Sequence, residues 1–502
     1  MEGSGTGRRS EDRQRDGVAE CWSDGPDPDP HYSVTPPLGR HGAPAPLEHC
    51  PRRLSHSVAC VRLICMPSKH VRKTRVFRRP PESSLFPPSI EDRVPSEHLV
   101  RHLKGLVEKV SGHEMRRLYE EQGGVAYDPV SLLSVELYGL MLGIRSSRQL
   151  EELCRYDARF WFLTGELVPD HNTLARFRHR LAEHLPEIFA RILDEARSQG
   201  MLGMKVVAVD GTKVEGNVSQ WKKIVAQANQ ADAPSDPDVG AMRSGRGSHI
   251  LGYNVQVGVD ADSGLIVGEV VTQAQNDTHV MPEVLDSIEQ FSGQLPEAVV
   301  ADGGYDSTEN HAELALRQVQ GFINPQGTRD AFWQVDEAGL ARCPMGHSPT
   351  YRGQFKKGSK LYDSYLVKEC PTCPLKPSCV KSRYKKLTAP VGLSPVIRLQ
   401  NAQRAHSPGG QTLLDKRKTW IELVFAQMKG NMGFRRFRTR GMDRVQAEFT
   451  MECIAYNTRK LLGRALLALY KILAGFQTQN RKQTEEMRLG NSHCWETVGA
   501  TH

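Results

Sequence analysis

Apolar residues at helical spacing form the first clear pattern along the chain. Between Val94 and Gly203 they recur every three or four positions, which places them on one face of successive helices. Asp128-Pro129 predicts one helix start, because proline is favoured at the first helical position. A later helix has three candidate N-caps, which are Asp170, Asn172 and Thr173. The pattern therefore predicts an all-α N-terminal domain over residues 91–203.

The pattern then changes to that of strands. Val206–Val209 and Ala298–Ala301 are short apolar runs, and each ends at an aspartate, Asp210 and Asp302 respectively. Between them, Tyr253–Val259 alternates apolar and polar residues, as a half-buried strand does. The other expected elements are strands over 265–272 and 322–323 and helices over 280–291, 309–319, 413–429 and 445–474. This order predicts an α/β core with a mixed sheet.

Three segments lack either pattern. Residues 1–90 are rich in Pro, Gly, Arg, Asp and Ser, and we expect them to be disordered. Two interpretations stay open there: translation begins at Met66, or the segment is a basic arm that contacts DNA. Residues 326–406 form a Cys- and Lys-rich insertion, and residues 477–502 a polar tail. The expected domains are therefore, in order, 1–90, 91–203, 204–325, 326–406, 407–476 and 477–502.

Composition and charge narrow the class of protein. The formal net charge is +8, from 66 Lys and Arg against 58 Asp and Glu, which fits a polyanionic partner without requiring one. No apolar run reaches the roughly 20 residues of a membrane span, and Arg464 and Lys471 interrupt the best candidate, Leu461–Phe476. We expect a cytoplasmic, nucleoid-associated protein whose 11 cysteines are free or metal-bound rather than disulfide-linked.

The two strand-end aspartates are the strongest chemical signal in the sequence. Ligands of α/β sheets gather at strand ends, and the glycines that follow Asp210 and Asp302 let a metal or a phosphate approach the backbone. Carboxylate oxygens are the ligands that Mg²⁺ prefers, and two metal ions stabilise the attacking and leaving oxygens of phosphoryl transfer. A strand-end aspartate is, however, also a common turn former or helix cap.

A third carboxylate is expected from a later helix. Glu422 lies in the segment KTWIELVFAQMKG, beside the apolar face of the predicted helix. Most helical glutamates are solvated surface residues, so the spacing alone is a weak argument for a catalytic triad. Glu448 and Glu452 are rival third acids.

Six segments of the chain resemble the DDE transposases of bacterial insertion sequences, in the branch with an extended helical N-terminal domain. They are AYDPVSLLSVELYGLMLGIRSSRQLEELCR, PDHNTLARFRHRL, VVAVDGTKVEGNVS, LGYNVQVGVD, VVADGGYDS and KRKTWIELVFAQMKGNMGFRRFRTRG. The resemblance runs from Val94 to Leu467. It implies a ribonuclease H-like catalytic core, with the first acid on strand one, the second after strand four and the third on a later helix.

Transferred to this chain, the resemblance places the catalytic, metal-binding acids at Asp210, Asp302 and Glu422. It implies cleavage and strand transfer of DNA with Mg²⁺ or Mn²⁺, in a two-ion site. The partners expected are the terminal inverted repeats of the element and the target DNA, and the active complex is expected to be a homodimer. Related proteins often carry a Tyr seven residues and an Arg four residues before the Glu; Asp415 and Lys418 stand there instead.

Basic residues supply candidate DNA contacts. In the C-terminal part these are Lys429, Arg435, Arg436, Arg438 and Arg440, and in the helical domain they are Arg176 and Arg178. The resemblance assigns the helical domain to binding of the element's ends. A helix with several arginines is more often simply an exposed face.

The insertion carries a candidate zinc site. Cys370-x-x-Cys373 is half of such a site, and Cys343 and Cys379 can complete four sulfur ligands, with His347 as a spare. The alternative is that all four are reduced free thiols.

Two other functions remain open at this stage. The chain can be a transposase-derived DNA-binding protein that has lost transposition activity, or a carboxylate-pair hydrolase acting on glycosides. The basic, aromatic-poor surroundings of Glu422 disfavour a sugar site. Dependence of the activity on a divalent metal would separate a transposase from a glycoside hydrolase.

Overall fold

A computed structural model of the chain describes residues 89–117, 119, 125–218, 235–243, 249–326, 333–358 and 360–464. The predictions of a disordered N-terminal segment, of a start at Met66 and of a polar tail fall outside these residues. Among the residues described, no helix is long and apolar enough to cross a membrane.

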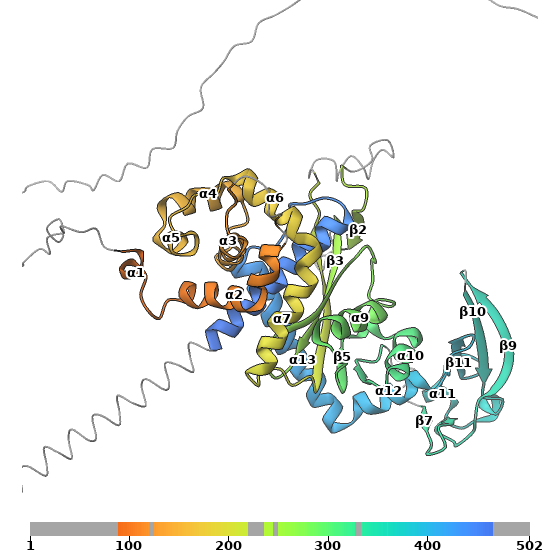
Figure 1. The fold of residues 1–502 in the computed structure, drawn as a ribbon. Coiled ribbons are helices and arrows are strands. Elements are labelled where there is room, and N and C mark those ends of the chain that lie inside the picture. The colour runs from red at the N-terminus through yellow and green to blue at the C-terminus, as the bar shows by residue number, and fades with distance from the viewer. Residues whose placement is uncertain are drawn as a thin grey trace, which may run out of the picture. The chain divides into compact units, whose positions relative to one another are not determined.

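The N-terminal part of the described chain is helical (Figure 1). Its helices are α1 (Ile90–Arg93), α2 (Leu99–Arg117), α3 (Pro129–Met141), α4 (Ser147–Tyr156), α5 (Ala158–Thr164), α6 (His171–Leu181) and α7 (Leu185–Ser198). Every residue of α3 is buried, as expected of a helix that is apolar all round. Pro129 starts this helix as predicted, and Asp170 is the N-cap of α6, where its carboxylate accepts hydrogen bonds from the backbone N–H groups of Asn172 and Thr173.

A six-stranded mixed sheet follows. Its strands are β1 (Val206–Glu215), β2 (Gly240–Arg243), β3 (His249–Asp260), β4 (Ile266–Thr272), β5 (Ala298–Ala301) and β6 (Gln320–Ile323). They lie in the order β2-β3-β1-β5-β6, with β4 paired to β3. The β1–β3 and β3–β4 pairs are antiparallel, whereas β5 is parallel to both β1 and β6.

Helices cover both faces of this sheet. Helix α9 (Met281–Ser292) packs on β3 and β4, where Gly258 and Gly268 leave room for the side chain of Ile288. Helix α13 (Pro408–Ala426) packs on β1, β5 and β6, and α7 packs on α9, which joins the helical part to the sheet. Helices α10 (Thr308–Leu316) and α12 (Ile397–His406) contact β6.

Two asparagines close the two edges of the sheet. The Asn457 amide, on the helical stretch 442–464, accepts from the N–H of Ile266 in β4 at 2.9 Å and donates to its carbonyl at 2.7 Å. Asn401 of α12 makes the same pair of bonds with Ile323 of β6, at 3.0 and 2.8 Å. Both amides are fully buried. Edge strands thus have backbone groups paired by side chains instead of by another strand.

The structure corrects one prediction and adds elements to a segment where none was predicted. Strand β1 does not end at Asp210 but continues to Glu215, because Gly211, Thr212 and Lys213 stay paired with β3. No strand or helix was predicted over residues 326–406. They contain β7 (Gln334–Val335), β8 (Ala341–Arg342), β9 (Thr350–Lys357), β10 (Lys360–Leu366), β11 (Lys386–Pro390) and α12. Strand β9 escaped detection because it is exposed on both faces, which removes the alternation of apolar residues.

Candidate functional site

Asp210 and Asp302 lie side by side on neighbouring strands. The parallel pairing of β1 and β5 sets Val209 opposite Ala301, and the aspartates are the next residues along the chain, Asp210 within β1 and Asp302 directly after β5. Asp302 begins a short 3-10 turn, η2 (Gly303–Tyr305), and its Oδ1 accepts a hydrogen bond of 2.8 Å from the N–H of Gly304. The structure therefore brings together two of the three predicted acids.

Burial and two neighbouring charged groups shift the pKa of Asp210. Burial raises its pKa, and the negative charge of Asp302 adds to this rise, whereas Arg417 opposes it. Arg417 Nη1 of α13 lies 2.8 Å from Asp210 Oδ2. An arginine that was not predicted thus balances part of the charge of the aspartate pair.

Strand β1 presents different partners on its two faces. On the face toward α13, Thr212 Oγ1 accepts a hydrogen bond of 2.6 Å from Lys429 Nζ. On the other face, Lys213 Nζ lies 3.6 Å from Asp277 Oδ1, in the loop that follows β4. Burial lowers the pKa of Lys429, with a further contribution from the positive charge of Arg435. The predicted phosphate contact Lys429 is therefore anchored two residues from Asp210.

Glu422, the third predicted acid, does not join this pair in the structure. Its side chain is exposed on α13, and within the described ranges it has no hydrogen bond or ion pair. Nor are any three His, Cys, Asp or Glu side chains in that part of the chain arranged to hold a metal ion. A π-helical turn, η4 (Gln427–Asn431), follows α13 directly.

The rival acids Glu448 and Glu452 belong to a different cluster. Both form ion pairs with Arg145 of the helical part. Glu448 also accepts hydrogen bonds from the backbone N–H groups of Arg438 and Thr439, and Glu452 is fully buried. Burial raises the pKa of Glu452 to about 7. These contacts commit both glutamates to packing between the helical part and the C-terminal helix.

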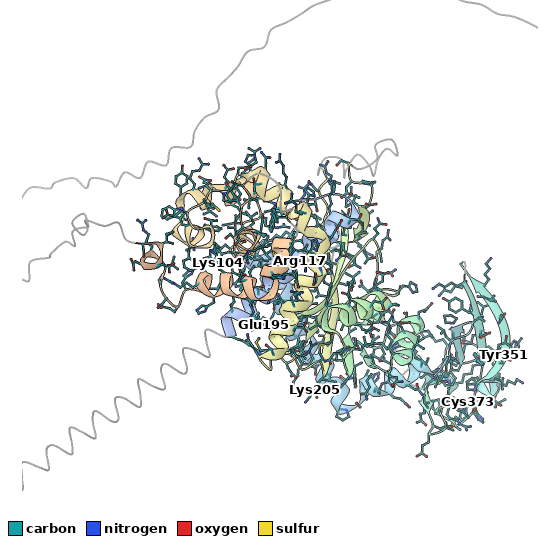
Figure 2. The ribbon with its side chains drawn as sticks, in the orientation of Figure 1. Lys104, Arg117, Glu195, Lys205, Tyr351 and Cys373 are labelled. Carbon is teal, nitrogen blue, oxygen red and sulfur yellow. The ribbon has the colours of Figure 1, made fainter. Side chains whose placement is uncertain are left out.

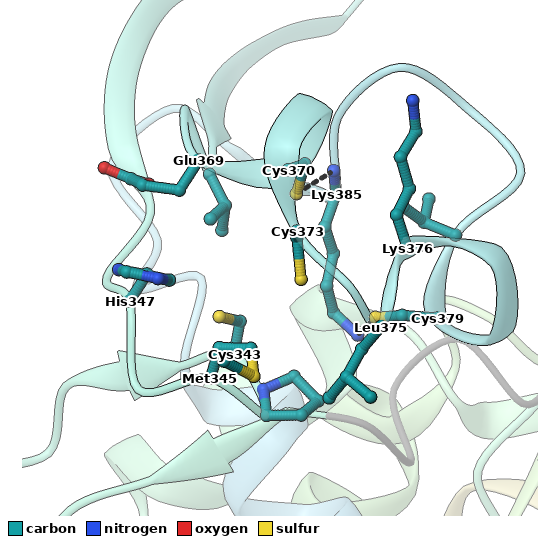
Figure 3. A pocket seen from close by; sticks show the side chains of 13 residues that line it. Cys343, Met345, His347, Glu369, Cys370, Cys373, Leu375, Lys376, Cys379 and Lys385 are labelled. Atoms are coloured by element: carbon teal, nitrogen blue, oxygen red, sulfur yellow. Dashed lines mark hydrogen bonds between the residues drawn. The ribbon is translucent and has the colours of Figure 1, made fainter.

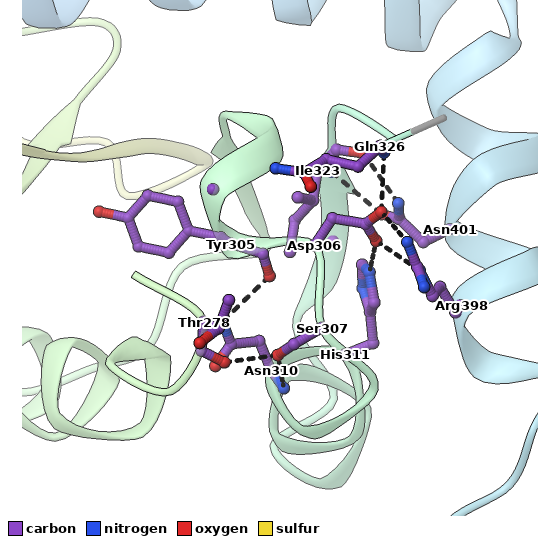
Figure 4. A network of polar contacts seen from close by, with 12 residues as sticks. Thr278, Tyr305, Asp306, Ser307, Asn310, His311, Ile323, Gln326, Arg398 and Asn401 are labelled. Carbon is purple, nitrogen blue, oxygen red and sulfur yellow. Dashed lines mark hydrogen bonds and ion pairs between the residues drawn. The ribbon is translucent and has the colours of Figure 1, made fainter. Parts of the chain in front are cut away.

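A buried polar network supports the turn that carries Asp302 (Figure 4). At its centre, Asp306 accepts bonds from Arg398 Nε at 3.0 Å and Arg398 Nη2 at 2.6 Å. His311 Nε2 lies 2.9 Å from Asp306 Oδ1, and the N–H of Gln326 donates to Oδ2 at 2.8 Å. Although burial acts to raise it, these bonds and the positive charge of Arg398 lower the pKa of Asp306 to about 2. The turn after β5 is thereby fixed to α10 and α12.

The predicted basic residues of the C-terminal part lie along the end of β1. Arg436 donates to the carbonyls of Gly216 and Val218, and Arg440 donates to that of Asn217 at 3.0 Å. Arg435 and Arg438 are exposed. Burial lowers the pKa of Arg438, and the positive charges of Arg145 and Arg178 lower it further. Arg435 also donates to the carbonyl of Lys429 at 2.9 Å, so backbone-directed arginines hold the segment while Arg438 stays exposed.

The two predicted arginines of the helical part differ in their surroundings. Arg176 is exposed. Arg178 is half-buried, with Nη2 2.7 Å from Glu136 Oε2 and Nη1 3.2 Å from the carbonyl of Arg145. Glu136 itself is fully buried. Arg178 thus neutralises a buried carboxylate, and only Arg176 of this pair is freely available to a phosphate.

The four predicted zinc ligands surround one small cavity (Figure 3). These are Cys343, Cys370, Cys373 and Cys379, and the cavity, of about 20 Å³, is also lined by His347. The buried side chain of Lys385 lies among them: its Nζ donates to Cys379 Sγ at 3.5 Å, and its N–H donates to Cys370 Sγ at 3.3 Å. The donor atoms are those zinc prefers, although in the described residues no three are arranged to hold an ion. In Figure 2, Cys373 and Tyr351 mark this part of the molecule.

Comparison with known proteins assigns two regions of the chain. A family described as "Transposase domain (DUF772)" matches residues 88–180, and one described as "Transposase DDE domain" matches residues 342–462. Among solved structures, the piggyBac transposase synaptic complex with hairpin DNA is similar, with 11% identity over 72% of each chain and a TM-score of 0.32. That score is too low to establish a shared fold. The search of curated proteins gives no match.

The two family matches cover most of the helical part and the segment from β8 to the C-terminal helix, including α13. Two regions of the chain therefore match transposase domains, the second of the DDE type, and this combination is typical of bacterial insertion-sequence transposases.

Proposed function

We propose that this protein is a transposase that cuts DNA at the ends of an insertion sequence and joins them to target DNA. In this proposal Asp210, Asp302 and Glu422 are the catalytic acids. The observation that carries it is the placement of Asp210 on β1 and of Asp302 directly after the parallel neighbour β5, where the charge of Asp302 acts to raise the pKa of Asp210. Two half-buried carboxylates whose charges act on each other are a common arrangement where a cation or a proton joins them.

The order of the strands supports a ribonuclease H-like core. Leaving aside the short β2, the first acid lies on the first strand and the second acid follows the fourth. The first three long strands are antiparallel to one another in succession, and the last two run parallel to the first. The third acid is carried by α13, which packs across β1, β5 and β6.

The aspartate pair fits the hard oxygen ligands of Mg²⁺ or Mn²⁺. Two bound ions would stabilise the attacking and leaving oxygens of an in-line displacement. Glu422 would complete the set only after a rotation or shift of α13, because its side chain points to solvent in this structure. The π-helical turn Gln427–Asn431 supports such a movement, since π-turns are local register defects that are frequent at functional sites.

The chemistry proposed has two steps. In the first, the oxygen of a water adds to the phosphorus at the element's end, the bond from phosphorus to the 3′ oxygen breaks, and that oxygen takes up a proton. In the second, the freed 3′ oxygen attacks a phosphorus of the target, whose own 3′ oxygen leaves. No covalent bond to the protein is needed, so the side chains act by positioning and charge. Lys429, anchored on Thr212, provides a positive charge for the phosphate.

The test uses duplex DNA that ends in the inverted repeat read from the sequence flanking the gene. We expect cleavage that requires Mg²⁺ or Mn²⁺ and falls by at least about 100-fold in Asp210→Asn, Asp302→Asn and Glu422→Gln. DNA affinity, measured by gel shift, should change little. Glu283→Gln, an exposed glutamate of α9, is the matched control.

The same experiment separates the alternative of a DNA-binding protein derived from a transposase. Such a protein would bind the repeat but would not cut it with any divalent metal. Retention of cleavage in Glu422→Gln alone would leave the aspartate pair in place and remove Glu422 from the proposed site.

A further inference from the structure

Asp277 is held in place from several directions at the site of the aspartate pair. Its Oδ1 accepts a bond of 2.8 Å from Asn254 Nδ2 and another of 2.8 Å from Gln256 Nε2. Both amides belong to β3 and are fully buried. Its backbone carbonyl accepts from Asn310 Nδ2 at 3.2 Å. A carboxylate fixed by two buried amides has lost its rotamer freedom before any ligand arrives.

The same contacts tie Asp277 to the turn that follows Asp302. Gln256 also accepts a hydrogen bond from the hydroxyl of Tyr305, and Asn310 also donates to the carbonyl of Tyr305 at 3.0 Å. Gly304 completes the connection: a Cβ there would lie 3.0 Å from Asp302 Oδ1 and 3.3 Å from Asp277 Oδ2. Asp277 and Asp302 therefore both approach the same glycine.

Lys213 is the positive charge that faces this arrangement. Its Nζ lies 3.6 Å from Asp277 Oδ1, and its side chain is only 18% exposed. Burial lowers the pKa of Lys213, and the charges of Asp277, Asp210 and Asp302 all act to raise it. The Lys213 ammonium thus interacts electrostatically with three carboxylates, and its ion pair is with Asp277.

We propose that Asp277 is a positioning residue that holds the Lys213 ammonium near the turn that carries Asp302 and within electrostatic reach of Asp210, where Lys213 contacts the phosphodiester being cut. The proposal rests on the proposed function. A phosphodiester is an anion and is repelled by a pair of carboxylates, so a fixed positive group beside them stabilises the charge that develops during displacement. A free lysine side chain carries about 2 kcal/mol of rotamer entropy, which an anchoring carboxylate removes in advance.

If Asp277 had only a structural role, an oxygen that accepts hydrogen bonds would be enough, and its charge would not matter. Asn254 and Gln256 need only an acceptor oxygen, which an asparagine at position 277 would supply as well as an aspartate. Asp277→Asn therefore keeps the loop in place and removes only the charge that faces Lys213. Any effect of this variant on cleavage without loss of stability reports the ion pair.

The experiment is a double-mutant cycle on the full-length protein, with the inverted-repeat duplex and Mg²⁺ in single turnover. We expect Lys213→Met to slow cleavage about 100-fold and Asp277→Asn about 10-fold or more, with unchanged DNA affinity and unchanged melting temperature. The double variant should be no slower than Lys213→Met, because Asp277 acts through the lysine. Asp277→Glu should recover part of the rate.

A second readout needs neither DNA nor metal. Brief acylation followed by peptide mass spectrometry measures the reactivity of Lys213 relative to exposed Lys356. Loss of the carboxylate in Asp277→Asn should make Lys213 react several-fold faster, because its amine is freer and less protonated. Asp286→Asn is the control. Asp286 lies on the surface of α9 and forms an ion pair of 2.6 Å with Arg317, which this substitution breaks.

Each outcome decides a specific point. Wild-type cleavage rates in Asp277→Asn, or losses that multiply in the double variant, would overturn the positioning role. Unchanged acylation of Lys213 in Asp277→Asn would overturn the ion pair. Absence of metal-dependent cleavage by the wild-type protein would overturn the proposed function and this proposal with it. That last failure is distinguishable, because the acylation measurement would still report the pair.

Discussion

Arg417 Nη1 lies 2.8 Å from Asp210 Oδ2, so the first proposed catalytic acid is already engaged by a cation of the protein. The arginine belongs to α13, the helix that also carries Glu422. A divalent ion at Asp210 must compete with this guanidinium for the same oxygen, because two positive charges at that distance repel. The helix that carries the proposed third acid, Glu422, therefore also carries a group that would compete with a metal ion at Asp210.

Arg417→Gln should tighten the binding of Mn²⁺ by about tenfold, which corresponds to removal of one competing charge in a partly buried site. Calorimetric titration of the free protein with Mn²⁺ measures this directly. Lys416→Gln, which removes an exposed charge from the neighbouring position on α13, should leave the affinity unchanged. Equal or weaker binding in Arg417→Gln would contradict competition between the arginine and the ion.

Asp306→Asn should destabilise the protein by roughly 2–3 kcal/mol at pH 7, because it leaves Arg398 and His311 without their buried carboxylate. This destabilisation is smaller than for a fully buried ion pair, because water screens the partly exposed side chain of Arg398. The pKa of Asp306 is lowered from 3.8 to about 2 in the folded protein. Its stabilising contribution is therefore complete above pH 4 and is lost as the pH falls toward 2.

Urea unfolding of the wild type and the Asp306→Asn variant at several pH values tests this expectation. The difference in unfolding free energy should shrink below pH 4. A difference that stays constant down to pH 3 would show that packing, and not the charge of Asp306, accounts for the loss.

Glu269→Gln should raise stability at alkaline pH. Burial raises the pKa of Glu269 from 4.5 to about 7, although hydrogen bonds from Thr450 and Gln446 oppose the rise. The folded protein then binds this proton more tightly than the unfolded chain, so stability is highest below pH 4.5 and falls as the pH rises to 7. Ionisation of Glu269 in the folded protein lowers the unfolding free energy by about 3 kcal/mol in total. An amide at this position has no charge to bury and should remove that part of the pH dependence.

Thermal unfolding between pH 5 and 8.5 provides the measurement for Glu269. The exposed Glu283→Gln serves as the control and should reproduce the wild-type profile. Parallel profiles for Glu269→Gln and the wild type would place the origin of the pH dependence elsewhere.

The cysteine cavity gives a prediction about metal content. We expect protein purified without chelators to contain about one zinc ion per chain, because four thiols around one cavity match a structural zinc site. Zinc binding would require Lys385 to move away from Cys379, and the thiolates would then attract its ammonium. Cys373→Ser should lower the zinc content in plasma emission measurements. Zinc-free protein that melts at the same temperature with and without added zinc would contradict the site.

Periodicity located most helices and strands, because apolar faces must be buried whatever the tertiary arrangement. The N-cap at Asp170 and the proline start of α3 followed from local chemistry in the same way. Asp210 and Asp302 were identified because each follows a short apolar run, and parallel neighbours bring such positions together. These features depend on a few adjacent residues.

The remaining parts of the site depend on how elements dock. Arg417 reaches Asp210 only because α13 lies across β1, and no spacing in the sequence encodes that contact. Asp277 follows β4, which runs in the same direction as β1 and β5, so the C-terminal ends of the three strands lie on the same side of the sheet. The sequence does not give the directions of the strands, and Asp277 could therefore not be placed near the site in advance. The direction of Glu422 depends likewise on the rotation of its helix.

The pairing of Asn401 and Asn457 with β6 and β4 sets the timing of sheet closure. Translation completes all six strands by residue 323, whereas the amides that cap the two outer strands emerge about 80 and 130 residues later. A nascent chain on the ribosome therefore presents two open strand borders for many seconds at usual rates of synthesis. Premature termination before residue 457 would leave the backbone N–H and carbonyl of Ile266 in β4 without these partners, and an unpaired strand border favours pairing between copies of the chain.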